Sequence, residues 1–123
     1  MLTHEKTIGG TTVRCDMVQL GEDAVVLLYG GDRAHIGSSV LAIPRPSLTG
    51  EGISATSSVL NCPGHKDELL ARLFAERLAA AINRTVACIC GVHVDGLDAA
   101  GIQAIMDGCQ ELLDELLLAA GVR

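Results

Sequence analysis

Residues Thr85–Val94, with the sequence TVACICGVHV, are apolar at almost every position and rich in β-branched side chains. A strand of this composition is typical of the centre of a sheet, where both of its faces are covered. We therefore expect Thr85–Val94 to form a central strand, with the rest of the chain arranged around it.

Two amphipathic helices flank this strand in the sequence. Apolar residues recur at spacings of three and four from Leu69 to Ile82, which predicts a helix that ends near Asn83. A second stripe with the same spacing runs from Ile102 to Leu117, and Asp98 is the expected N-cap of that helix. Each stripe is broad enough to pack against a sheet.

The first half of the chain carries four strand patterns: Thr11–Leu20, Ala24–Tyr29, His35–Ile43 and Ile53–Cys62. The turn Gly21–Asp23 joins the first two into a hairpin. Pro44 and Pro46 end the third, because proline cannot continue a central ladder. The order of four strands, helix, strand and helix indicates an α+β fold, a mostly antiparallel β-sheet with two α-helices on one face. We expect residues 1–123 to form one domain.

Composition excludes several classes of function. The net charge of −6 and the pI of about 5.0 argue against a broad surface for nucleic acid or anionic lipid. Charged residues interrupt the longest apolar stretches before they reach the roughly 18 residues of a membrane span. The five cysteines follow neither a disulfide framework nor a metal-site spacing, so we expect reduced thiols in a cytoplasmic protein.

Three polar clusters stand at the ends of these apolar segments. Gly30–Ser39 combines glycines, charges of both signs, an imidazole and hydroxyl groups, and the other clusters are Ser54–Asp67 and Gly91–Gly96. Strands and helices would deliver all three to one edge of the sheet. We therefore expect the clusters to form one site.

Each cluster also has a simpler interpretation. The glycines of Gly30–Asp32 match neither a P-loop nor a dinucleotide fingerprint, so on its own this segment favours a turn between strands. The histidines lack the spacing of a helical metal pair, which leaves a metal unassigned. Ser54–Ser58 has no nucleophile elbow, so we assign no catalytic residue. Gly64-His65-Lys66 before a helix offers backbone N–H groups and a cation, which points to a phosphate.

The ordered motifs resemble those of the LpdD-like family of prenylated flavin chaperones. The motifs that carry the resemblance are Gly30–Gly37, Pro44–Ser47, Ser54–Leu60, Gly64–Lys66 and Gly91–Asp95. The resemblance implies a protein that binds prenylated FMN and assists its maturation in, or delivery to, a UbiD-type apo-decarboxylase such as gallate decarboxylase. It also implies a dimer-forming fold similar to the small proteasome-assembly chaperones.

Prenylated FMN has a phosphate, a ribityl chain and an apolar multi-ring head, and the sequence contains candidate partners for each. Candidates for the phosphate are Arg33, Arg45 and Lys66. Candidates for the ribityl hydroxyls are Ser38, Ser54, Thr56 and Ser58. The head would lie against Ile36 and Val92, with close approach at Gly37 and Gly91. The groups left for the pyrimidine edge or for redox tuning are Asp32, His35, His65, His93 and Asp95.

The sequence therefore predicts a cytoplasmic homodimer that binds prenylated FMN, or FMN itself, near its interface and has little or no turnover of its own. Two alternatives remain open. A small enzyme could use His35, His65 or His93 as acid or base with Asp32 or Asp95. A structural subunit could instead dock the apolar face of a helix on a decarboxylase.

Overall fold

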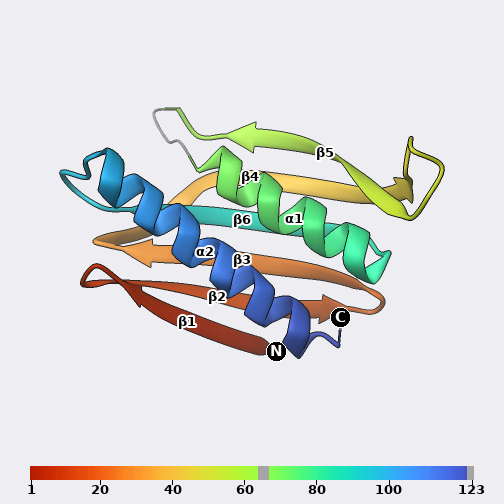
Figure 1. Ribbon diagram of the computed structural model, residues 1–123, viewed down its shortest axis with the longest axis horizontal. Helices are drawn as coiled ribbons and strands as arrows, with labels where there is room; N and C mark the ends of the chain where they lie inside the picture. Colours follow the sequence, from red (N-terminus) through yellow and green to blue (C-terminus); the bar gives the residue numbers. More distant parts are fainter. Residues whose placement is uncertain (64–66, 122–123) are drawn as a thin grey trace.

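The computed structural model describes residues 1–63 and 67–121. Its elements are β1 (Leu2–Ile8), β2 (Thr11–Leu20), β3 (Asp23–Gly31), β4 (Arg33–Pro46), β5 (Ile53–Asn61), α1 (Glu68–Ile82), β6 (Val86–His93) and α2 (Ala99–Ala119). The strands form one sheet in the order β1-β2-β3-β6-β4-β5, and both helices lie on one face of it (Figure 1). Only β3 and β6 pair in parallel. The expected α+β class, with a mostly antiparallel sheet, is confirmed.

The strand β6 lies between β3 and β4, so its central place is confirmed. Val86, Cys88 and Cys90 are fully buried beneath the helices, whereas Ala87 and Ile89 on the other face are only half-buried. The sequence predicts that both faces of this strand are covered, but in the structure the helices cover only one of them. The reason is that both helices pack on the same side of the sheet.

The turn at Gly30–Asp32 carries the chain around the end of β6. Gly31 of β3 and Arg33 of β4 both pair with His93, so β6 separates the two strands that this turn joins. Gly31 has a φ of +81°, and a Cβ there would overlap the carbonyl group of His93. Glycine is needed here because the chain is both left-handed and in close contact with β6.

In the described core between sheet and helices, Phe74 is the one aromatic residue and the other residues have aliphatic or sulfur-containing side chains. The helix α1 packs on β4, β5 and β6, and α2 packs on β1. Four cysteines lie in this core, and burial raises the pKa of the Cys15 thiol to about 11 and that of Cys109 to about 12. Such thiols are inert at neutral pH.

The edge strand β1 is absent from the sequence prediction. It pairs with β2 through the Gly9-Gly10 turn, and its half-buried positions are Leu2, His4, Lys6 and Ile8. Two of these four residues are polar, which weakens the apolar alternation that marks a strand. The Gly-Gly dipeptide is the signal that could have identified this hairpin.

We call the side of the sheet opposite the helices the open face, because no helix of the described chain covers it (Figure 1). Its central residues are apolar and partly or largely exposed: Val18, Val25, Leu27, Leu41, Ile43 and Ile89. No helix in the described part of the chain is long and apolar enough to cross a membrane.

A polar cluster around Asp16 borders the apolar centre of the open face. The carboxylate of Asp16 accepts hydrogen bonds from Tyr29 (2.8 Å), Thr3 (2.9 Å) and Arg14 (3.1 Å). Burial by itself raises the pKa of Asp16, but these hydrogen bonds outweigh it and hold the pKa below its ordinary value of 3.8.

Candidate functional site

A cavity of about 640 Å³ opens between the beginnings of α1 and α2 and the end of β6. Three polar side chains lie on its wall: His35, Asp67 and His93. The apolar side chains from the two helices and the segment before α2 are Leu69, Leu70, Leu97, Ile102, Ile105 and Met106. A cavity of this size, largely apolar with a few convergent polar groups, is typical of a small-molecule site.

The topology brings these elements together at one end of the molecule. Both helices begin, and β6 ends, at the same end of the sheet (Figure 1). Asp98 caps α2 by accepting a hydrogen bond from the backbone N–H of Gly101 at 2.7 Å. Asp67 occupies the corresponding N-cap position of α1 but makes no side-chain capping bond.

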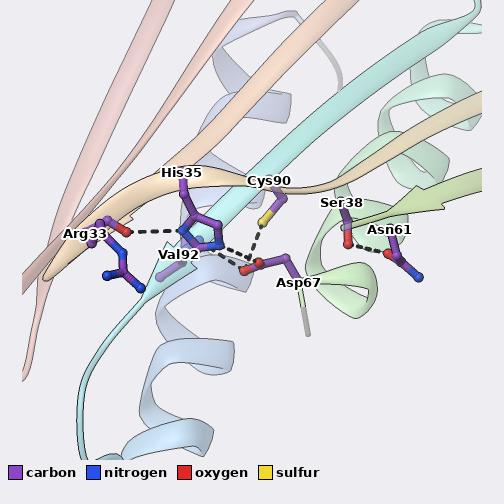
Figure 2. Close-up of polar contacts among 7 residues, drawn as sticks. All are labelled: Arg33, His35, Ser38, Asn61, Asp67, Cys90 and Val92. Atoms are coloured by element: carbon purple, nitrogen blue, oxygen red, sulfur yellow. Dashed lines mark hydrogen bonds and ion pairs between the residues drawn. The ribbon is translucent and has the colours of Figure 1, made fainter. Parts of the chain in front are cut away.

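The carboxylate of Asp67 is instead the polar centre of the cavity, and the residue is 6% exposed. Its Oδ1 accepts a hydrogen bond from the backbone N–H of Val92 at 3.0 Å, and its Oδ2 lies 3.1 Å from Nε2 of His35 (Figure 2). The Sγ of Cys90 lies 3.9 Å from Oδ1. Asp67 therefore connects the beginning of α1 to both β6 and β4.

Two glycines make room for this arrangement. A Cβ on Gly37 would overlap the carboxylate of Asp67, and a Cβ on Gly91 would overlap the backbone of His35. The sequence predicts that the flavin head approaches closely at these glycines. In the structure, the groups that approach them are the Asp67 carboxylate and the backbone of His35.

A second group of predicted residues meets beside the first. The Nε2 of His93 lies 2.7 Å from Oδ1 of Asp95, and the backbone N–H of Asp95 donates to Oδ2 of Asp32 at 2.8 Å. The rings of His35 and His93 are 6.4 Å apart between centroids and nearly perpendicular. The structure therefore brings Asp32, His35, His93 and Asp95 to one end of the sheet. Arg33 pairs with His93 in the ladder there, and its side chain is exposed.

Four other predicted residues lie away from the cavity. Arg45 is ten residues beyond His35 on the long strand β4, which corresponds to roughly 30 Å along an extended chain. Its Nε donates a hydrogen bond to Oγ1 of Thr56 at 2.7 Å. Ser54 and Ser58 share the open face with Thr56 because strand residues alternate between faces. The cavity lies on the helix side.

Ser38 is fully buried, and its hydroxyl donates to Oδ1 of Asn61 at 2.6 Å (Figure 2), so it does not line the cavity. Ile36 is 62% exposed and does not line it either, whereas Val92 does. The predictions for His65 and Lys66 fall outside the described residues.

Sequence reasoning placed Asp67 at the end of a polar cluster but gave it no role in the site, and it missed the apolar wall from α2. It assigned Ile102, Ile105 and Met106 to the core stripe, and helical spacing cannot distinguish a core position from a cavity wall. The sequence feature that comes closest to indicating Asp67 is His35, because an imidazole that is buried needs a hydrogen-bond partner.

A second cavity, of about 600 Å³, lies at the other end of the molecule and contains none of the predicted site residues. No group of three or more His, Cys, Asp or Glu residues in the described ranges could hold a metal ion.

Comparisons with known proteins complete the description of the site. Residues 7–120 match the model of the family described as "Prenylated flavin chaperone LpdD-like domain". Among solved structures, a chain from "Crystal Structure of a Novel Chaperone Complex for Yeast 20S Proteasome Assembly" is 16% identical, with a TM-score of 0.48 and alignment over 93% of this chain and 95% of the other. No curated protein matches this chain.

Proposed function

The chain belongs to the LpdD-like family of prenylated flavin chaperones, and on that premise we propose that it binds prenylated FMN in the cavity between α1, α2 and β6. We propose further that it assists maturation of this cofactor in, or its delivery to, a UbiD-type decarboxylase. The observation that carries the proposal is the meeting of an aliphatic wall with His35, Asp67 and His93 in one cavity.

The aliphatic wall suits the head of prenylated FMN, whose extra ring adds apolar surface to the flavin. Ile102, Ile105 and Met106 would bind this surface through buried apolar area. A methionine adapts to an irregular ligand because its side chain is unbranched and flexible. No phenylalanine, tyrosine or tryptophan lines the described cavity, so binding would not depend on stacking against such a ring.

The polar end of the cavity suits the hydrophilic part of the cofactor. Of the two arginines expected to bind phosphate, Arg33 lies at the cavity end of the sheet, whereas Arg45 lies at the far end of β4. An exposed guanidinium can bind a phosphate through two parallel hydrogen bonds. We therefore assign the phosphate to Arg33 and use Arg45 as the matched control.

We propose that the chain carries the cofactor and does not turn over a substrate of its own. In the described residues the cavity presents no serine, threonine or lysine as a nucleophile. The thiol of Cys90, which lies 3.9 Å from Oδ1 of Asp67, is buried, and this burial raises its pKa far above the ordinary value. The alternative of a small enzyme would then depend on His93 with Asp95, or on His35 with Asp67, as acid or base.

We also propose a homodimer formed through the open face. Strands spaced by about 4.8 Å, each pairing over about eight residues, give the sheet a face of roughly 700 Å². A specific interface of standard size buries about 800 Å² from each partner. A second copy supplies a face of the same size with the same apolar centre. The cavity, on the helix side, would stay outside this interface.

The dimer is tested by sedimentation of the wild type and of a Leu41→Asp variant, because Leu41 is 46% exposed on the open face. We expect a dimer at micromolar concentration for the wild type and a monomer for the variant. A wild type that is monomeric with and without flavin contradicts the dimer.

Cofactor binding is tested by purification from a host that makes prenylated FMN, followed by flavin extraction and mass spectrometry. We expect a coloured protein with nearly one prenylated FMN per chain. The loaded protein should then activate a purified UbiD-type apo-decarboxylase faster than free prenylated FMN does. A colourless protein that neither takes up prenylated FMN nor activates the decarboxylase contradicts the proposed function.

A further inference from the structure

We infer that Asp67 is the residue that positions His35 in the cavity, by holding a proton on Nε2 of the imidazole. The inference concerns the protein itself and rests on the proposed function only for its effect on flavin binding.

The contacts of the His35 ring fix its orientation. Nε2 lies 3.1 Å from Oδ2 of Asp67, and Nδ1 lies 3.3 Å from the backbone carbonyl oxygen of Arg33 (Figure 2). A carboxylate and a carbonyl can only accept hydrogen bonds, so each ring nitrogen faces an acceptor. Turning the ring over would place carbon atoms against both oxygens. The ring therefore has one favourable orientation. Because a carboxylate is a stronger acceptor than a backbone carbonyl, we infer that the proton of a neutral ring lies on Nε2 and is directed at Asp67.

Asp67 can fix this ring because it is itself held from several sides. Its side chain is 7% exposed, and Oδ1 accepts the backbone N–H of Val92 at 3.0 Å. Gly37 packs against the carboxylate from β4 without a side chain between them. A hydrogen bond to a carboxylate gains strength where water is excluded. The unused capping position of α1 agrees with this role, since the carboxylate is directed at β4 and β6 instead.

The neighbouring pair of His93 and Asp95 provides a natural contrast. Its Nε2 to Oδ1 distance of 2.7 Å is shorter, but the side chains are 36% and 82% exposed. Water competes for both partners of such a pair and screens their charges. Removing the carboxylate of Asp95 should therefore leave the orientation of His35 unchanged.

One consequence concerns how a ligand meets His35. Both nitrogens of the ring lie within hydrogen-bonding distance of protein oxygens, so we expect a ligand to meet the ring through its face or its C–H edge. His35 then shapes the site for a flat ligand such as a flavin. It is not arranged as a base that removes a proton from a substrate.

The experiment is ¹⁵N NMR of the histidine rings in the ligand-free protein, with a His35→Gln variant to assign the His35 signals. We expect the wild-type spectrum to show a proton on Nε2 of His35. In Asp67→Asn the introduced amide can donate to Nε2, so the proton should move to Nδ1 and bind the Arg33 carbonyl. The matched control Asp95→Asn should leave the His35 signals unchanged.

Two results overturn the inference. One is a wild-type His35 protonated on Nδ1 alone, a result that does not depend on the folding of Asp67→Asn. The other is a folded Asp67→Asn protein with His35 signals like those of the wild type.

Titration with prenylated FMN supplies a second readout. Asp67→Asn should weaken binding about tenfold, the lower end of the loss seen when the carboxylate that orients a metal-ligating histidine is removed. The double variant Asp67→Asn/His35→Gln should bind no more weakly than His35→Gln alone, because Asp67 acts through His35. A double variant that binds clearly more weakly than His35→Gln alone overturns the positioning role. If the NMR results are as expected and the wild type binds no prenylated FMN, the proposed function fails while the inference stands.

Discussion

Replacement of His35 by alanine should destabilise the protein, whereas replacement of His93 should not. The side chain of His35 is 14% exposed and donates to the buried carboxylate of Asp67. Removing it leaves that carboxylate with its backbone bond from Val92 but without its imidazole partner. His93 is 36% exposed and its partner Asp95 is 82% exposed, so water replaces what the variant loses.

The magnitudes follow from these exposures. A hydrogen bond to a buried charged group contributes about 1.5–3 kcal/mol to the free energy of unfolding. A surface ion pair contributes at most about 1 kcal/mol. For a domain of this length 1 kcal/mol corresponds to about 4 °C in Tm. We therefore expect His35→Ala to lower Tm by about 6–12 °C and His93→Ala by less than about 4 °C.

Thermal melts of the ligand-free variants, with urea denaturation as a second measure, test this difference. Flavin titrations on the folded fraction should show weaker binding for both variants, since both rings line the cavity. A His35→Ala protein that melts like the wild type refutes the buried role of His35. Equal destabilisation by the two variants refutes the reasoning from exposure.

Three further predictions rest on separate contacts. Gly91→Ala should lower the free energy of unfolding by about 2 kcal/mol or more, because its Cβ would overlap the backbone of His35. Urea denaturation measures this, and an unfolding midpoint equal to that of the wild type contradicts it. The pKa of Asp16 is lower in the folded protein than its ordinary value of 3.8, so the ionised carboxylate stabilises the fold above that value, and this stabilisation is lost as the pH falls through the folded pKa. The free energy of unfolding should therefore fall less steeply with decreasing pH for Asp16→Asn than for the wild type. Identical pH profiles contradict this. Arg33→Ala should weaken prenylated FMN binding in a titration while Arg45→Ala does not, and the opposite pattern removes Arg33 from the site.

The sequence predicts most of this fold because periodicity is a local property. The stripes of α1 and α2 and the apolar run of β6 appear as expected, and α1 ends at the left-handed Asn83. The sequence did not predict β1 because its apolar alternation is weak. His4 and Lys6 occupy half-buried positions at the sheet edge, where their long side chains can still reach water.

The site was harder to predict because it depends on strand order. Polar clusters at strand ends indicate one edge of a sheet, and that logic brings His35 and His93 together. It fails for Arg45 and Thr56, since a strand as long as β4 has two distant ends and two faces. The contact of Asp67 with His35 arises only once β6 is inserted between β3 and β4.

The affinity of prenylated FMN for two cavity-filling variants decides whether the cavity between α1, α2 and β6 is the flavin site. Ile105→Phe fills the cavity between α1, α2 and β6, and Ile82→Phe is its control in the cavity at the other end of the molecule. Fluorescence titration should show that Ile105→Phe loses affinity while Ile82→Phe binds like the wild type. Equal affinities for all three proteins, or a loss confined to Ile82→Phe, contradict the assignment of this cavity to the flavin.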